Sequence, residues 1–190
     1  MRKVKYFVAN SLDNFIARPD GAVDWLFMEG DYGMREFFAS IDTMLMGRKT
    51  YDFARSHSPK RKAKRKPRQT QSKVAAKARM RTYVFSRTLT ADADESVEIV
   101  SAEAGAFVRK LKREAGKDIW LMGGGELARS LFAEKLVDEI GLNIHPVLLG
   151  AGIPLFPDIG RQLDLELLAC KAHDNGCVQV SYRVKQIEAV

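Results

Sequence analysis

The sequence has few cysteines and no long apolar run, and both absences narrow what the chain can be. The only two cysteines, Cys170 and Cys177, are too few for a structural zinc site. They flank an expected hairpin turn and would lie on opposing strands without facing each other directly. We therefore expect no metal site, no disulfide and a reducing compartment. No stretch approaches the roughly 20 apolar residues that a membrane helix needs. Asn10, Asp13 and Asn14 interrupt the first apolar segment too early for a signal peptide, so we expect a cytoplasmic protein without membrane contact.

Acidic residues are missing from one long stretch of an otherwise mildly acidic chain. Residues 55–81 contain 12 of the 31 Lys and Arg and no Asp or Glu, so the rest carries a net charge of −5 against +7 for the whole chain. The stretch has no apolar period and no face to pack, so we expect a mobile basic insert in a single domain, 1–190. A patch for RNA, acidic membrane or targeting is the alternative, and a solvated loop is the favoured reading.

Strand-like and helix-like segments alternate along the chain as far as residue 145. Beyond it, two strand-like segments surround the turn signal Asn175-Gly176 and predict an antiparallel hairpin. This order predicts an α/β fold in three layers: a mixed, mostly parallel sheet with helices on both faces and an antiparallel C-terminal hairpin. The expected strands are 3–9, 42–46, 82–85, 97–100, 119–122, 137–145, 162–172 and 177–184, and the expected helices are 33–40, 102–115 and 126–134.

Three turns suited to phosphate follow expected strands. The strongest is Gly123-Gly124-Gly125, because backbone N–H groups at the positive end of a helix bind phosphate and glycine lets a pyrophosphate approach closely. The second, Gly47-Arg48-Lys49-Thr50, supplies two cations and a hydroxyl, and the third is Ser86-Arg87. Each alone is also typical of an ordinary turn or helix start. Together they favour a nucleotide site, because α/β sheets bind ligands at the carboxyl ends of their strands.

Taken in order, these motifs make the sequence resemble the dihydrofolate reductase superfamily, and within it the reductase-type domain of riboflavin biosynthesis, the RibD C-terminal-like family. The resemblance runs from residue 4 to about residue 184 and leaves only the basic insert outside it. The matching segments are 11–17, 20–25, 46–51, 83–87, 123–125, 136–140 and 146–156.

The resemblance implies a dihydrofolate reductase-like sandwich with an eight-stranded mixed sheet, a homodimer, and NADPH as cofactor. It also implies an oxidoreductase that transfers a hydride to a small planar heterocycle of the pteridine or aminopyrimidine type. Trp25 and Phe37 would line the substrate pocket, and Asp31 is the candidate catalytic acid. The residues assigned to the cofactor are Val8, Ala9 and Ile16 at the nicotinamide, Gly47, Arg48, Lys49 and Thr50 at the phosphates, Ser86 and Arg87 at the adenine ribose and its 2′-phosphate, and Gly123, Gly124, Gly125, Glu126 and Leu127 at the pyrophosphate.

Two departures from the family pattern leave alternatives open. Asn14 stands where the family usually has Gly, although Asn tolerates a positive φ. Asp31 competes with Glu29 and Glu36 for the acid's place, and a carboxylate there is also typical of a helix cap. His145, before a proline at a strand end, is expected to be structural. The other functions that remain open are the 5-amino-6-(5-phosphoribosylamino)uracil reductase of riboflavin biosynthesis and a non-catalytic nucleotide- or nucleic-acid-binding protein.

Overall fold

The computed structural model describes residues 1–57, 80–89, 97–156 and 158–185. Strands and helices alternate in these residues until the chain ends in a pair of strands. In chain order the elements are β1 (Val4–Ser11), β2 (Phe15–Ala17), α1 (Met34–Ser40), β3 (Ile41–Gly47), α2 (Arg48–His57), β4 (Arg81–Phe85), β5 (Val97–Val100), α3 (Ala104–Arg113), β6 (Asp118–Gly123), α4 (Gly125–Ala133), β7 (Glu139–His145), β8 (Ile153–Pro154), β9 (Leu165–Ala172) and β10 (Val178–Val184).

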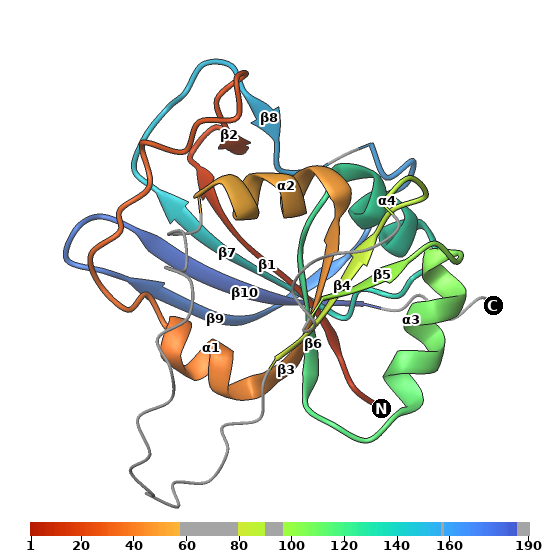
Figure 1. The fold of residues 1–190 in the computed structure, drawn as a ribbon. Coiled ribbons are helices and arrows are strands. Elements are labelled where there is room, and N and C mark those ends of the chain that lie inside the picture. The colour runs from red at the N-terminus through yellow and green to blue at the C-terminus, as the bar shows by residue number, and fades with distance from the viewer. Residues whose placement is uncertain (58–79, 90–96, 157, 186–190) are drawn as a thin grey trace, which may run out of the picture.

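One eight-stranded sheet organises the domain, in the order β5-β4-β3-β6-β1-β7-β10-β9 (Figure 1). The strands from β5 to β7 pair in parallel, whereas β10 pairs antiparallel with both β7 and β9. A separate antiparallel pair joins β2 to β8. The predicted fold class, with its antiparallel C-terminal hairpin, is therefore confirmed.

Helices cover both faces of the sheet, because successive side chains of a strand point to opposite faces. Leu121 of β6 packs into the larger core cluster with residues of α3 and α4. On the other face Phe7 packs against Phe37 of α1, and Met46 packs against Tyr51 of α2. Figure 1 shows the two helix pairs, α1 with α2 and α3 with α4, on different sides of the sheet.

The structure corrects both ends of the predicted basic insert, 55–81. The residues up to His57 belong to α2, and Arg81 is the first residue of β4. α2 extends this far because Tyr51 anchors it in the core and the Arg55 guanidinium lies 5.6 Å from the centre of the Tyr51 ring, within cation–π range. Met80 packs against the cluster of Phe7 and Phe37, and residues 58–79 of the insert lie outside the described residues.

Three smaller expectations can be compared with the structure. Asn14 has a φ of 64°, so it does adopt the left-handed turn that glycine would allow. Cys170 and Cys177 are both free. Within the described residues, no helix combines the length and the apolar character that crossing a membrane requires.

Candidate functional site

The order in which strands are added to the sheet reverses between β3 and β6, which are parallel neighbours. From β3 the chain continues to β4 and β5 on one side, and from β6 it continues to β7 on the other. α2 follows β3 directly and packs on one face, whereas α4 follows β6 and packs on the other. In α/β sheets such a switch point leaves a crevice at the carboxyl ends of the strands, where ligands bind. Both glycine motifs singled out from the sequence lie at this point.

The two glycine turns touch each other. A Cβ on Gly124 would lie 2.9 Å from the backbone N and Cα of Gly47, and a Cβ on Gly47 would lie 3.3 Å from the Cα of Gly124. Gly124 also has a φ of +105°, which residues with a side chain rarely adopt. Backbone packing and this φ therefore already favour glycine at position 124, independently of the pyrophosphate to which the resemblance assigns it. Gly125 differs: its φ is not positive and a Cβ there would meet nothing within 4 Å.

The turns leave two helix N-termini beside each other. Gly124 is the N-cap residue of α4 and provides no side-chain cap, and Thr50 Oγ1 lies 3.4 Å from where a Gly123 Cβ would be. Backbone N–H groups at such a terminus can hold an anion. Among the residues assigned to the pyrophosphate, Glu126 is exposed and Leu127 is buried in the core, so Leu127 reaches this region only through its backbone.

The cations near the switch point differ in their partners. Arg48 opens α2, and its Nε lies 2.6 Å from Oδ2 of Asp52, one turn along the helix. Lys49 and Arg87 are exposed, and neither forms an ion pair with another described residue. These two side chains are therefore the ones with charge available for a phosphate.

Ser86 has a structural task in addition to its predicted one. Its buried hydroxyl oxygen accepts hydrogen bonds from the N–H groups of Thr88, at 3.3 Å, and Leu89, at 3.0 Å. This side-chain turn ends β4 and places Arg87 beyond the strand. The hydroxyl proton can still be donated to a ligand.

The central strand, β1, pairs with β6 and therefore lies beside the switch point. Val8 and Ala9 are half-buried near the end of β1, between β6 and β7, and Ile16 of β2 packs against the larger core cluster. The turn between β1 and β2 is held by Asp13, whose carboxylate accepts hydrogen bonds from the Gly150 and Leu149 N–H groups at 2.8 and 3.1 Å.

The Asp13 carboxylate is further held by the Ser11 hydroxyl, which donates to it at 2.6 Å. This bond lowers the pKa of Asp13, and the Gly150 and Leu149 N–H groups lower it further. Asp13 thus ties the start of the β2 segment to the loop after β7. The sequence pattern alone does not assign it this role.

The predicted substrate residues lie on the α1 face of the sheet. Phe37 of α1 stacks on Phe7 of β1 with ring centroids 4.4 Å apart. The Phe7 ring leans across Gly141 of β7, where a Cβ would approach it to 2.1 Å. Trp25 is buried and meets the His145 ring edge-on at 5.3 Å. An apolar floor and an aromatic wall therefore occupy the same face.

Asp31 has the geometry of a helix cap. It is exposed, and its Oδ1 accepts a hydrogen bond of 2.9 Å from the N–H of Arg35 in the first turn of α1. Its backbone oxygen accepts a second bond from the N–H of Met34 at 2.7 Å. The competing acids, Glu29 and Glu36, are exposed as well.

His145 is a residue whose surroundings the sequence does not reveal. It is buried at the end of β7 and is surrounded by rings of Trp25, Phe27 and Tyr32, all from the loop before α1. Burial lowers the pKa of His145, and its hydrogen bond to the Asn143 carbonyl partly opposes the shift. The aromatic composition of residues 25–32 was the available signal.

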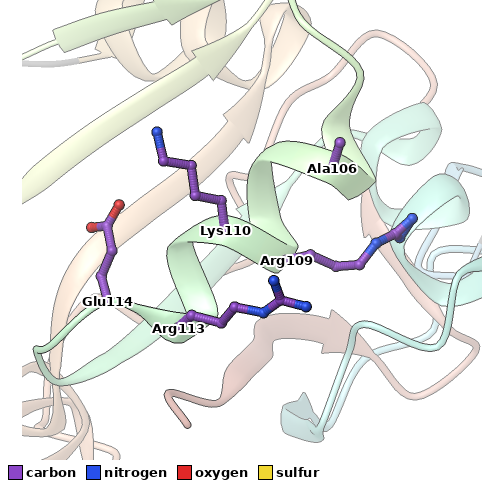
Figure 2. A pocket seen from close by; sticks show the side chains of 5 residues that line it. All are labelled: Ala106, Arg109, Lys110, Arg113 and Glu114. Carbon is purple, nitrogen blue, oxygen red and sulfur yellow. The ribbon is translucent and has the colours of Figure 1, made fainter.

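A separate hollow of about 490 Å³ lies on the outer surface of α3 (Figure 2). Arg109 at its edge is paired with Glu134 at 2.6 Å, and Glu114 is 3.3 Å from Arg81. None of the predicted site residues lines it, and we assign it no function. Its lining residues are Ala106, Arg109, Lys110, Arg113 and Glu114.

Comparison with known proteins agrees with this architecture. An uncharacterized protein of Bacillus subtilis strain 168, YyaP, is 37% identical over 181 residues, covering 95% of this chain and 94% of its own. A solved protein of Shewanella sp. PV-4, whose name links it to riboflavin biosynthesis, has 24% identity and a TM-score of 0.77, with 98% of this chain and 100% of that chain covered.

The deaminase/5-amino-6-(5-phosphoribosylamino)uracil reductase of Thermotoga maritima also shares the fold. It has 17% identity and a TM-score of 0.68, and the alignment covers 97% of this chain and 57% of that one. The model of the RibD C-terminal domain matches residues 2–179. The chain belongs to the RibD C-terminal domain family, within the dihydrofolate reductase-like superfamily that the sequence motifs indicated.

Proposed function

We propose that this protein is an NADPH-dependent oxidoreductase that reduces a small planar heterocycle of the pteridine or aminopyrimidine type. The contact between Gly47 and Gly124 is the observation that supports this most directly, because it sets two helix N-termini side by side at the switch point of the sheet. Membership of a family whose relatives include named reductases supports the same reaction class.

The residues at the switch point fit a dinucleotide phosphate. Gly125 leaves open space at the first position of α4, as a closely approaching pyrophosphate requires. Lys49 and Arg87 have charge that no described residue neutralises, and Arg87 follows the strand next to β3, where a 2′-phosphate would lie under this assignment. Arg48 can contribute only by sharing its guanidinium with Asp52.

NADPH, when bound, supplies the hydride, and the protein's own contribution is position and exclusion of water. Val8 and Ala9 offer half-buried backbone next to the crevice for the nicotinamide. Phe7 and Phe37, which are buried and stack on each other, contribute an apolar wall on this face. A water-poor pocket strengthens every polar contact made inside it.

The proton that accompanies reduction has two candidate sources. The resemblance proposes Asp31, whose observed contacts are those of a cap on α1. The other source is solvent, because a substrate ring that is easily protonated can take a proton from water without the help of a side chain. The Asp31→Asn substitution separates these routes, because it removes the carboxylic acid and leaves access of solvent unchanged.

The edge of the sheet supports the proposal of a homodimer. Every residue of β9 is exposed, including Leu165, Leu167 and Leu168 at 39%, 56% and 39% of their surfaces. An edge strand with apolar side chains is a surface that proteins usually cover. We propose that a second copy covers it, in the reducing cytoplasm, where Cys170 on this strand would stay free.

Titration of NADPH and NADH against the full chain, followed by protein fluorescence, tests the proposed function. We expect NADPH to bind more tightly than NADH, and a screen of pteridines and aminopyrimidines then identifies substrates by NADPH oxidation. Absence of NADPH binding would overturn the proposal. Family membership also favours 5-amino-6-(5-phosphoribosylamino)uracil as a second candidate substrate, and the screen should contain it.

A further inference from the structure

The β2–β8 unit, which consists of residues 12–17 and 146–155, is built separately from the main sheet. β2 and β8 are three and two residues long and form a two-stranded sheet of their own, with an irregular register. Figure 1 shows this pair beyond the end of β1. An isolated antiparallel pair of this length is at best marginally stable, so other contacts must hold the unit in place.

The Asp13 carboxylate joins the two halves of the β2–β8 unit. Its Oδ2 accepts a hydrogen bond from the Gly150 N–H at 2.8 Å, and its Oδ1 accepts one from the Leu149 N–H at 3.1 Å. Oδ1 also accepts a bond of 2.6 Å from the Ser11 hydroxyl, whose oxygen accepts from the Phe15 N–H at 2.9 Å. Hydrogen bonds to an ionised acceptor are about twice as strong as those between neutral groups. Successive backbone N–H groups in a turn form a concave anion site, and here the protein's own carboxylate fills it.

This joint continues the pairing of β1 with β7. The last register pair of these strands is Ser11 with His145, and the Leu12 N–H then donates to the Val147 oxygen at 2.9 Å. The Asp13 bonds follow directly on both segments. The carboxylate therefore fixes where the β2–β8 unit stands relative to the carboxyl ends of β1 and β7.

The joint and the glycine turns lie on opposite sides of the switch point. Gly47 and Gly124 are at the carboxyl ends of β3 and β6, whereas the Asp13 joint is at those of β1 and β7. These four strands are parallel, so their carboxyl ends share one edge of the sheet. A dinucleotide held by its phosphates at the glycine turns would extend along this edge to the joint. The residues assigned to its nicotinamide end include Ala9 of β1 and Ile16 of β2, so that end is divided between the main sheet and the β2–β8 unit.

We propose that Asp13 is a positioning residue, which sets the place of Ile16 relative to β1 and thereby forms the nicotinamide end of the site. Without the carboxylate the β2–β8 unit moves away from β1 and water reaches the nicotinamide. The phosphate end stays intact, because Gly47 and Gly124 pack on each other without help from the unit. This inference rests on the proposed function, since it assigns a residue to the cofactor site of that function.

Two ligands separate the two ends of the site. NADPH occupies both ends, whereas adenosine 2′,5′-bisphosphate carries the adenine ribose and its 2′-phosphate but no nicotinamide. In titrations of the full chain, Asp13→Ala should weaken NADPH at least about tenfold and change the affinity for the bisphosphate by less than about twofold. The emission of bound NADPH is a second measurement, because reduced nicotinamide fluoresces more strongly when water is excluded from it. The wild type should show this enhancement, and Asp13→Ala should lose most of it.

A milder variant and a matched control accompany this experiment. The amide oxygen of Asp13→Asn can replace only one of the two carboxylate oxygens, so we expect the same selective loss in smaller measure. This variant decides the question where Asp13→Ala does not fold. Asp20→Asn is the control, because Asp20 Oδ1 accepts a hydrogen bond from the Ala22 N–H at 2.9 Å in a turn of the following loop. It should keep the affinities and the emission of the wild type.

The outcomes distinguish this inference from the proposed function. NADPH affinity and emission that are unchanged in both Asp13 variants would overturn the inference. An equal loss of NADPH and bisphosphate affinity would overturn it as well, because a purely structural role predicts that result. A wild type that binds neither ligand contradicts the proposed function itself, whereas a wild type that binds both, with variants that behave alike, contradicts only the role of Asp13.

Discussion

The glycine turns allow a prediction in which neighbouring substitutions have opposite effects. In Gly124→Ala the new methyl would meet the Gly47 backbone at 2.9 Å, and backbone cannot rotate away as a side chain can. The φ of +105° adds strain of about 1–2 kcal/mol for a residue with a Cβ. Overpacking of this kind costs about 1–3 kcal/mol more. The two together predict a loss of roughly 2–5 kcal/mol in the free energy of unfolding.

Gly125→Ala should leave the fold intact. Its Cβ would occupy open space at the first residue of α4. Alanine in a helix is more stable than glycine by up to about 1 kcal/mol, so stability should be unchanged or slightly higher. The same methyl would stand where a pyrophosphate approaches the helix, and we expect NADPH affinity to fall at least about tenfold, or 1.4 kcal/mol.

Thermal unfolding and NADPH titration of both variants check the pair. For a chain of this size 1 kcal/mol shifts Tm by roughly 2–4 °C, so Gly124→Ala should lower Tm by about 4–20 °C. Wild-type Tm in Gly124→Ala would refute the contact between the turns. Normal NADPH binding in Gly125→Ala would show that Gly125 serves only the turn.

Three further predictions follow from the charges and polar groups of the site. Arg87→Gln and Lys49→Gln should each reduce the preference for NADPH over NADH, as measured by titration calorimetry with both cofactors. An equal loss of both affinities would refute the assignment of these residues to the 2′-phosphate. The pKa of His145 lies below its ordinary value of 6.5, so the unfolded chain takes up a proton that the folded protein does not. The free energy of unfolding, measured with urea, should therefore fall as the pH drops below about 6.5. The His145→Phe variant should lack this part of the loss. Turnover of dihydrofolate should be far below the median enzyme value of about 10 per second and indifferent to Asp31→Asn, because the Asp31 carboxylate caps α1; fast turnover abolished by that substitution would make Asp31 a catalyst.

Local sequence patterns sufficed for most of the sheet and for the glycine turns that follow its strands. Runs such as 97–100 and 119–122 are short and mostly apolar, so their strands follow from their length and composition, and β5 has the predicted bounds. Gly123 to Gly125 and Gly47 mark strand–helix turns because backbone freedom is a local property. The sequence does not predict α2 as a helix, because the segment that begins at Arg48 is rich in charged residues and its apolar face is narrow. Only the structure shows that Tyr51 packs into the core.

Tertiary structure decided which of these local features meet and for what reason. Gly47 and Gly124 are far apart in the chain, and only the pairing of β3 with β6 brings their backbones into contact. His145 looked structural because its partners come from the distant loop that contains Trp25 and from register with β1. Strand register and loop packing depend on long-range contacts, so the sequence by itself determined the fold class and the glycine turns, whereas the contact between the turns and the ring cluster around His145 were decided only by the tertiary structure.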